Sequence, residues 1–187
     1  STTLKPEDLT TDALDIIVGQ ETDSYIVRAV VGANETLYIF KNQSIWQLYG
    51  RTTSTFELRK LTDKYGLAAK KGIYPVAGGF VFLNEFDKEL YFFGGSEGTI
   101  KPMTEDTIRL RNILDIGQID NIDMTVHDGL FRFAFKHKDD SIYQNRELIY
   151  PLNDPRPDGN PRWSMIKGSK VLCYALEQQQ GDDNILL

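Results

Sequence analysis

The chain of 187 residues contains one cysteine, Cys173, and only two histidines, His127 and His137. A single cysteine cannot form an intramolecular disulfide, and we expect a small buried apolar side chain there. Both histidines fall at predicted turns, where we expect them to be solvated, and neither has the Cys or His spacing of a zinc site. The sequence therefore indicates neither a disulfide framework nor a zinc motif.

Long apolar runs and clusters of basic residues are also missing. No apolar run is long enough to cross a bilayer, and the N-terminal residues lack the charged-then-apolar pattern of a secretion signal. The net charge is −6, the pI is near 5.0, and Lys70-Lys71 is the largest group of cations. We therefore expect no membrane insertion, no specific nucleic-acid binding and synthesis in a reducing compartment. Ser1 in place of Met indicates processing or a fragment.

Aromatic-rich β-hairpin signals are present and recur about every 40 to 50 residues. They cover residues 36–49, 80–93, 130–150 and 170–187, and the last one is unfinished. Hydrophobic residues make up 41% of the chain, which suffices for a packed core. Short strands and tight turns at this period are typical of β-propeller blades, which bury their apolar faces on one another.

The predicted fold is all-β, a β-propeller or partial propeller of about four antiparallel blades in one domain. The blades lie near 14–50, 56–103, 118–166 and 169–187, the last of them incomplete. The four blades are either part of a larger ring or a ring closed by a strand at 14–18. One short inter-blade helix is predicted at 104–116, with Thr104 as its cap and Gly117 after its end.

Three loops resemble ligand sites. Residues 94–98 are rich in glycine, but they lack the lysine-containing ending of a phosphate loop, so we interpret them as a turn. The proline-rich stretch 151–161 cannot be a strand. It carries Asp154, Asp158 and Asn160, and a second loop carries Asp182 and Asp183. Their spacing differs from that of a dedicated calcium loop, which leaves a weak surface cation as the alternative.

Carboxylates are the only serious candidates for catalysis, because no Gly-x-Ser-x-Gly elbow is present. Propeller glycosidases place acids on inner strands, and four acids lie in or beside predicted strands: Asp15, Glu89, Asp123 and Glu147. The alternative is that each is a strand-edge or turn acid in water. We assign no catalytic, cofactor-binding or metal-binding residue.

Aromatic residues could also form a platform that stacks sugars or bases. Their positions in strands favour packing between blades instead. The residues concerned are Tyr25, Tyr38, Trp46, Tyr49, Tyr74, Tyr91 and Trp163.

The segment Leu37-Tyr-Ile-Phe-Lys-Asn-Gln-Ser-Ile-Trp-Gln-Leu-Tyr-Gly50 resembles a phrase common in propeller-type structural proteins of tailed bacteriophages and prophages. In that phrase an aromatic-ended strand is followed by a lysine-containing turn and then by a Ser-Ile-Trp strand that ends in glycine. Four downstream features resemble the same layout: Tyr65-Gly66 with Gly72-Ile73, the 80–93 hairpin, residues 107–116, and 146–150 with Trp163. The resemblance covers residues 12–163.

This resemblance implies a non-enzymatic role in the virion, in the tail, neck or tail nozzle, without a cofactor. The implied partners are copies of the chain in a ring and neighbouring tail or portal-proximal proteins, all assembled in the host cytoplasm. Complete members are usually longer, so the chain is expected to be a piece of a longer protein. The alternatives are a carbohydrate-binding or glycan-cleaving propeller acting on host surface polysaccharide, and a generic interaction scaffold.

Overall fold

The computed structural model describes residues 18–19, 26–33, 36–50, 55–94, 99–104, 108–140, 145–152, 163–169, 174, 176–178 and 184–186. Within these ranges the chain is all-β apart from two short 3-10 segments. The strands form three four-stranded antiparallel sheets and one two-stranded sheet. This confirms the predicted all-β class.

Each four-stranded sheet is a meander of consecutive strands. The first sheet contains β1 (Val27–Ala33), β2 (Thr36–Lys41), β3 (Ile45–Tyr49) and β4 (Glu57–Thr62). The second contains β5 (Ile73–Val76), β6 (Gly79–Leu83), β7 (Leu90–Gly94) and β8 (Thr99–Pro102). The third contains β9 (Asp123–His127), β10 (Leu130–Phe135), β11 (Asn145–Pro151) and β12 (Ser164–Ser169). The two-stranded sheet pairs β13 (Leu176–Gln178) with β14 (Asn184–Leu186).

The turn between β9 and β10 shows how local sequence sets the meander. Asp128 and Gly129 both have positive φ, at 51° and 70°. A two-residue hairpin turn of this kind needs left-handed backbone at both positions, which Asp tolerates and Gly adopts freely. The twist of such a turn matches the twist of the strands on either side, so β9 and β10 pair directly.

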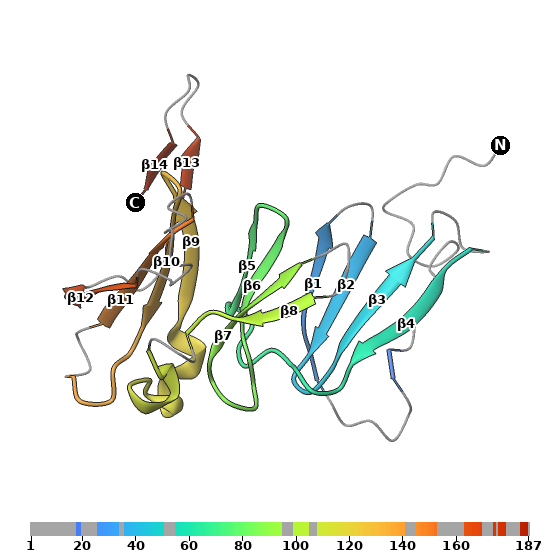
Figure 1. Ribbon diagram of the computed structural model, residues 1–187, viewed down its shortest axis with the longest axis horizontal. Helices are drawn as coiled ribbons and strands as arrows, with labels where there is room; N and C mark the ends of the chain where they lie inside the picture. Colours follow the sequence, from blue (N-terminus) through green and yellow to red (C-terminus); the bar gives the residue numbers. More distant parts are fainter. Residues whose placement is uncertain are drawn as a thin grey trace, which may run out of the picture.

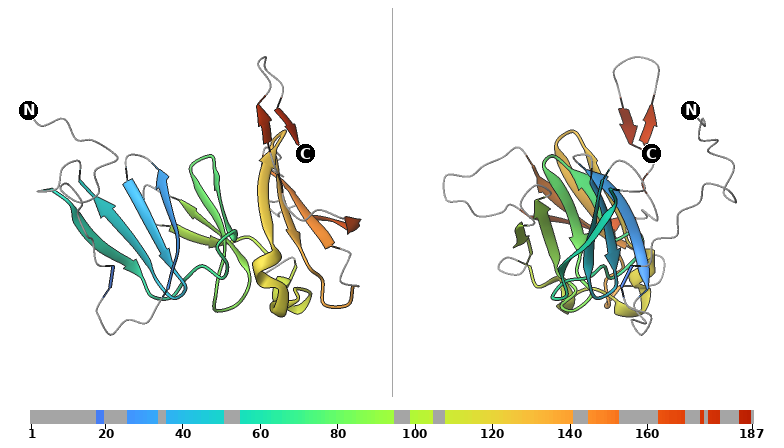
Figure 2. Two further views of the ribbon diagram at one scale, coloured as in Figure 1. Left: turned by 180° about the vertical axis from the view of Figure 1, so that it is seen from behind. Right: turned by 90° about the vertical axis from the view of Figure 1, so that its right-hand side faces the viewer.

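The three sheets lie side by side in chain order (Figure 1). After a 90° turn the view is along the long axis of the molecule, and the three sheets overlap in it (right-hand view of Figure 2). The sheets are therefore stacked along that axis. Two clusters of buried side chains hold the stack together. We call the cluster between the first and second sheets the first seam, and the cluster between the second and third sheets the second seam.

The second sheet buries both of its faces. Along β6, Phe80 and Phe82 point into the first seam, and Val81 and Leu83 point into the second. All five residues of β6 are buried. Successive side chains of a strand point to opposite faces, so a sheet covered on both sides has a continuous apolar run. The sequence Gly-Phe-Val-Phe-Leu is such a run.

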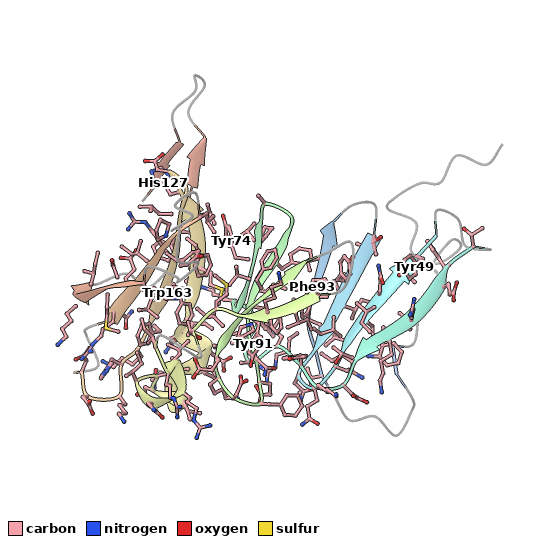
Figure 3. All side chains as sticks on the ribbon, in the orientation of Figure 1. Tyr49, Tyr74, Tyr91, Phe93, His127 and Trp163 are labelled. Atoms are coloured by element: carbon pink, nitrogen blue, oxygen red, sulfur yellow. The ribbon has the colours of Figure 1, made fainter. Side chains whose placement is uncertain are left out.

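The first seam is built from aromatic rings. Tyr38 and Phe40 of β2 meet rings of β6 and β7, with centroids 5.1 to 6.2 Å apart and mostly edge-to-face. Tyr91 and Phe93 lie in this region of the molecule (Figure 3). Tyr38 and Tyr91 therefore confirm the predicted role of aromatic side chains in packing between sheets. Aromatic pairs of this geometry stabilise the folded state by about 0.5 to 1.5 kcal/mol beyond the contribution of their buried area.

The predicted helix at 104–116 is wrong. The described part of this stretch contains one 3-10 turn, Leu110–Asn112, and a second 3-10 segment, Ile116–Asn121, begins before the expected stop at Gly117. Leu110 and Leu114 are drawn into the second seam. Leu114 also forms a β-bridge with His137. These long-range contacts hold this stretch of backbone in an irregular conformation instead of a regular helix.

The sheet boundaries differ from the predicted blade boundaries. β4 pairs with β3, so the strand expected to open the second blade at 56 completes the first sheet. Residues 116–121 form the 3-10 segment rather than part of the third blade's sheet. Pro151, expected in a loop, is the last residue of β11. The predicted strand at 14–18 lies outside the described residues except for Val18.

Candidate functional site

Two of the four candidate acids share the outer face of the third sheet, which points away from the second seam. Asp123 of β9 and Glu147 of β11 both pair with Ala134 of β10, from opposite sides. Side chains directly opposite one another in a sheet point to the same face. Two strand spacings separate the two residues, which corresponds to about 10 Å between their Cα atoms.

Both carboxylates already have structural partners. Arg132 Nη1 donates to Glu147 Oε1 at 2.9 Å, and Glu147 is 4% exposed. The backbone N–H groups of Met124 and Tyr174 donate to the two oxygens of Asp123, each at 2.9 Å. Burial, together with the nearby Glu147 carboxylate, raises the pKa of the Tyr174 phenol far above its ordinary value. These contacts are those of a polar cluster that holds strands and the Tyr174 backbone together.

Glu89, the third candidate acid, holds the chain segment after β8 in position through hydrogen bonds, and we call this role a brace. Its carboxylate accepts from the Thr104 hydroxyl at 2.7 Å and from the backbone N–H groups of Leu110 and Arg111 at 3.0 and 3.3 Å. Burial raises the pKa of Glu89, and these three hydrogen bonds oppose the shift. Glu89 directly precedes β7 of the second sheet, whereas Asp123 and Glu147 lie in the third sheet. The fourth acid, Asp15, lies outside the described residues.

The two histidines differ from the predicted solvated state. His137 is 5% exposed, and its Nδ1 accepts from the backbone N–H of Asp139 at 3.1 Å. Its pKa is lowered by burial and by the charge of Arg146. His127 is half-buried at the end of β9, with Nε2 at 3.3 Å from Asp128 (Figure 3). No group of three or more His, Cys, Asp and Glu side chains suited to a metal ion occurs among the described residues.

A cleft of about 800 Å³ opens between the second and third sheets. We call it the inter-sheet cleft, and Tyr74, which Figure 3 labels, is one of its lining residues. The sequence analysis did not predict this cleft. Tyr74-Pro75 was a usable signal for part of it, because proline is confined to edge strands and β5 is the edge strand of the second sheet. The lining residues are Tyr74, Pro75, Val76, Ala77, Val81, Phe92, Lys101, Pro102, Met103, Val126, Gly129, Tyr150 and Leu152.

The first sheet carries apolar side chains on the face that points away from the first seam. Strand register places Val30, Leu37, Ile39, Trp46 and Leu48 there. Val30 is 56% exposed and Leu37 is 44% exposed, whereas Ile39 and Leu48 are buried. Contrary to prediction, Trp46 therefore does not pack between sheets; Lys60 Nζ lies 5.9 Å from its ring centroid. We call this surface the outer face of the first sheet.

The other predicted aromatic residues fall at several places. Trp163 packs against Tyr150 and Phe131 at the second seam, and its Nε1 donates to the carbonyl of Met103 at 3.0 Å. Tyr49 is exposed at the end of β3, where its hydroxyl donates to Gln47 (Figure 3). Several further predictions lie outside the described residues: those for Tyr25, Asp154, Asp158, Asn160, Cys173, Asp182, Asp183 and the glycine-rich residues 95–98.

Comparison with models of known protein families gives no match to this chain, and comparison with curated protein sequences gives none either. In the described ranges, no helix has the length and apolar character needed to cross a membrane.

Proposed function

We propose that the protein is a non-enzymatic structural component of a bacteriophage virion, in the tail, neck or nozzle. Its sheets would be blades of a propeller or of part of one. The observation that carries the proposal is the stack of three consecutive meanders, in which the middle sheet buries both faces. Propeller blades are four-stranded antiparallel sheets stacked in this way. The resemblance of residues 37–50 to phage propeller proteins supports the virion role.

The outer face of the first sheet supports an assembly role. Val30 and Leu37 are exposed on a sheet whose other face is sealed in the first seam. An exposed apolar surface of this kind is typical of a protein–protein contact. In the proposed assembly this face packs against a copy of the chain or against a neighbouring tail or portal-proximal protein. A head-to-tail contact between copies closes into a ring when its rotation allows.

Light scattering after size exclusion tests the assembly role. The wild-type chain is expected to form a discrete oligomer, and Leu37→Glu is expected to reduce it to a monomer, because a charge cannot be buried there without a partner. Phe86→Glu is the matched control, since Phe86 is 54% exposed in the β6–β7 turn. Antibody labelling of negatively stained phage particles tests the virion role. A wild-type monomer that is also missing from particles would overturn the proposal.

The inter-sheet cleft favours a second candidate function, binding of a host surface glycan. Tyr74, Phe92 and Tyr150 offer rings on which sugars could stack. No carboxylate lines the cleft among the described residues, so glycan cleavage would have to use Asp123 and Glu147 on the far face of the third sheet. Hydrolysis assays on host polysaccharide with Glu147→Gln, and binding assays with Tyr74→Ala, separate this function from the structural one.

A further inference from the structure

We infer that the inter-sheet cleft binds a small amphipathic anion, with an apolar body between the two sheets and one carboxylate or sulfonate at Lys101. This goes beyond the proposed structural role and does not depend on it. The inference rests on the shape of the cleft, the chemistry of its described walls and the position of Lys101.

The walls of the cleft come from two different sheets. β5, β6, β7 and β8 contribute Tyr74, Val81, Phe92 and Pro102, while β9 and β11 contribute Val126 and Tyr150. Small-molecule sites are concave, mostly apolar and roughly 300 to 1,000 Å³ in volume. A cleft of about 800 Å³ with these walls lies within that range. An aliphatic or aromatic body would replace water along both walls, which is favourable in proportion to the apolar area covered.

Lys101 supplies the charge. It lies in β8 directly opposite Phe92 of β7, so both side chains are on the face of the second sheet that borders the cleft. Among the described residues that line the cleft, Lys101 is the only charged one. In the described part of the chain, no acidic group lies within ion-pair distance of it. An unpaired cation at the rim of an apolar cleft complements an anionic group on an apolar ligand.

The described walls carry few polar groups, so an amphipathic anion fits the cleft better than the glycan of the second candidate function does. Besides Lys101, the only polar side-chain groups among the described lining residues are the hydroxyls of Tyr74 and Tyr150. A sugar carries many hydroxyls, and each one buried without a partner is costly. An amphipathic anion needs one charged contact and otherwise apolar cover, which is the composition that the cleft offers. The ligand class is therefore a medium-chain fatty acid or an aromatic carboxylate or sulfonate.

A fluorescence titration with 1-anilinonaphthalene-8-sulfonate on the folded wild-type chain tests the inference. We expect saturable binding at the cleft and competition by octanoate. 1-Octanol and maltohexaose, which lack a charge, should compete much less. Lys101→Gln should weaken binding about 1.4- to fivefold, because a solvent-exposed ion pair contributes about 0.2 to 1 kcal/mol. Lys101→Glu should weaken it further, and added salt should weaken wild-type binding.

Two further variants test whether the fluorescence signal comes from ligand bound in the cleft. Lys64→Gln is the matched control, because Lys64 is an exposed lysine that does not line the cleft. Ala77→Trp places a large ring at the mouth of the cleft from an exposed position in the β5–β6 turn, so it should block binding without disturbing the core. Equal binding by Lys101→Gln and wild type, equal competition by 1-octanol and octanoate, or unchanged binding by Ala77→Trp would each overturn the inference.

Discussion

The ring of Tyr38 meets the ring of Phe93 edge-to-face, with centroids 5.1 Å apart, and joins the first sheet to the second. Phe93 also stacks on Phe80 within its own sheet at 6.2 Å. All three rings are at most 1% exposed. The contact between the two sheets depends on these large side chains and on residues 67 and 68, whose backbone N–H groups donate to Lys41 of β2 and Leu83 of β6.

Phe93→Ala should lower the free energy of unfolding by about 3 to 5 kcal/mol, because it leaves a cavity in the first seam. Phe86→Ala is the control, since this ring is 54% exposed, and its effect should stay within about 0.5 kcal/mol. Urea denaturation followed by tryptophan fluorescence measures both. Equal midpoints for the two variants would show that the first seam contributes little to stability.

Glu89→Ala should destabilise the protein by about 2 to 4 kcal/mol, because it leaves the buried N–H of Leu110 and the hydroxyl of Thr104 without their acceptor. Glu89→Gln retains one side-chain oxygen as an acceptor and should cost less. Thermal or urea unfolding of the two variants measures the difference. If Glu89→Ala unfolded at the wild-type midpoint, the bracing role of this carboxylate would be wrong.

The pH dependence of this brace has a definite sign. Burial raises the pKa of Glu89 in the folded state, so the folded protein binds the proton more tightly than the unfolded chain does. The stability of the wild type relative to Glu89→Gln should therefore be greatest below the ordinary carboxyl pKa of about 4.3. It should fall as the pH rises through the raised pKa. Urea unfolding of both proteins at several pH values measures this, and a difference that grew with pH would contradict the assignment.

The contribution of His137 to stability should have the opposite dependence on pH. Burial and the charge of Arg146 lower its pKa, against the smaller opposing effects of Asp140 and Asp139. The folded state therefore favours neutral imidazole, and stability should be lost as the pH falls from about 6.5 towards the lowered pKa. His137→Asn retains an acceptor for the N–H of Asp139 and should remove this part of the pH dependence. Denaturation between pH 5 and 7.5 provides the measurement.

The hairpins were predictable from the sequence because their signal is local. Alternation and turn residues locate β2, β3, β6 and β7 to within about one residue, since a strand's faces and a tight turn's backbone depend on neighbours in sequence. The continuous apolar run Gly-Phe-Val-Phe-Leu also indicates that β6 is buried on both faces of its sheet.

The remaining features depend on contacts between distant residues. The apolar spacing of 104–116 favoured a helix, but Glu89, more than twenty residues upstream, accepts the N–H groups of Leu110 and Arg111. His137 was expected to be solvated because charged residues surround it in sequence, whereas Leu114 bridges to it and it is buried. The inter-sheet cleft combines residues from two sheets, so no single stretch of sequence contains its pattern.

The ion pair between Arg132 and Glu147 is suited to a double-mutant cycle, because the two residues are diagonal neighbours on the same face of β10 and β11 and Glu147 is almost fully buried. Glu147→Leu alone should cost about 2 to 4 kcal/mol, since it leaves the partly buried guanidinium without its acceptor. Arg132→Met alone should also destabilise, because it leaves Glu147 buried and unpaired. The double variant should recover most of the loss, because neither charge is then left without its partner. Urea unfolding of the four proteins gives the coupling energy, and strictly additive losses would show that the two residues act independently.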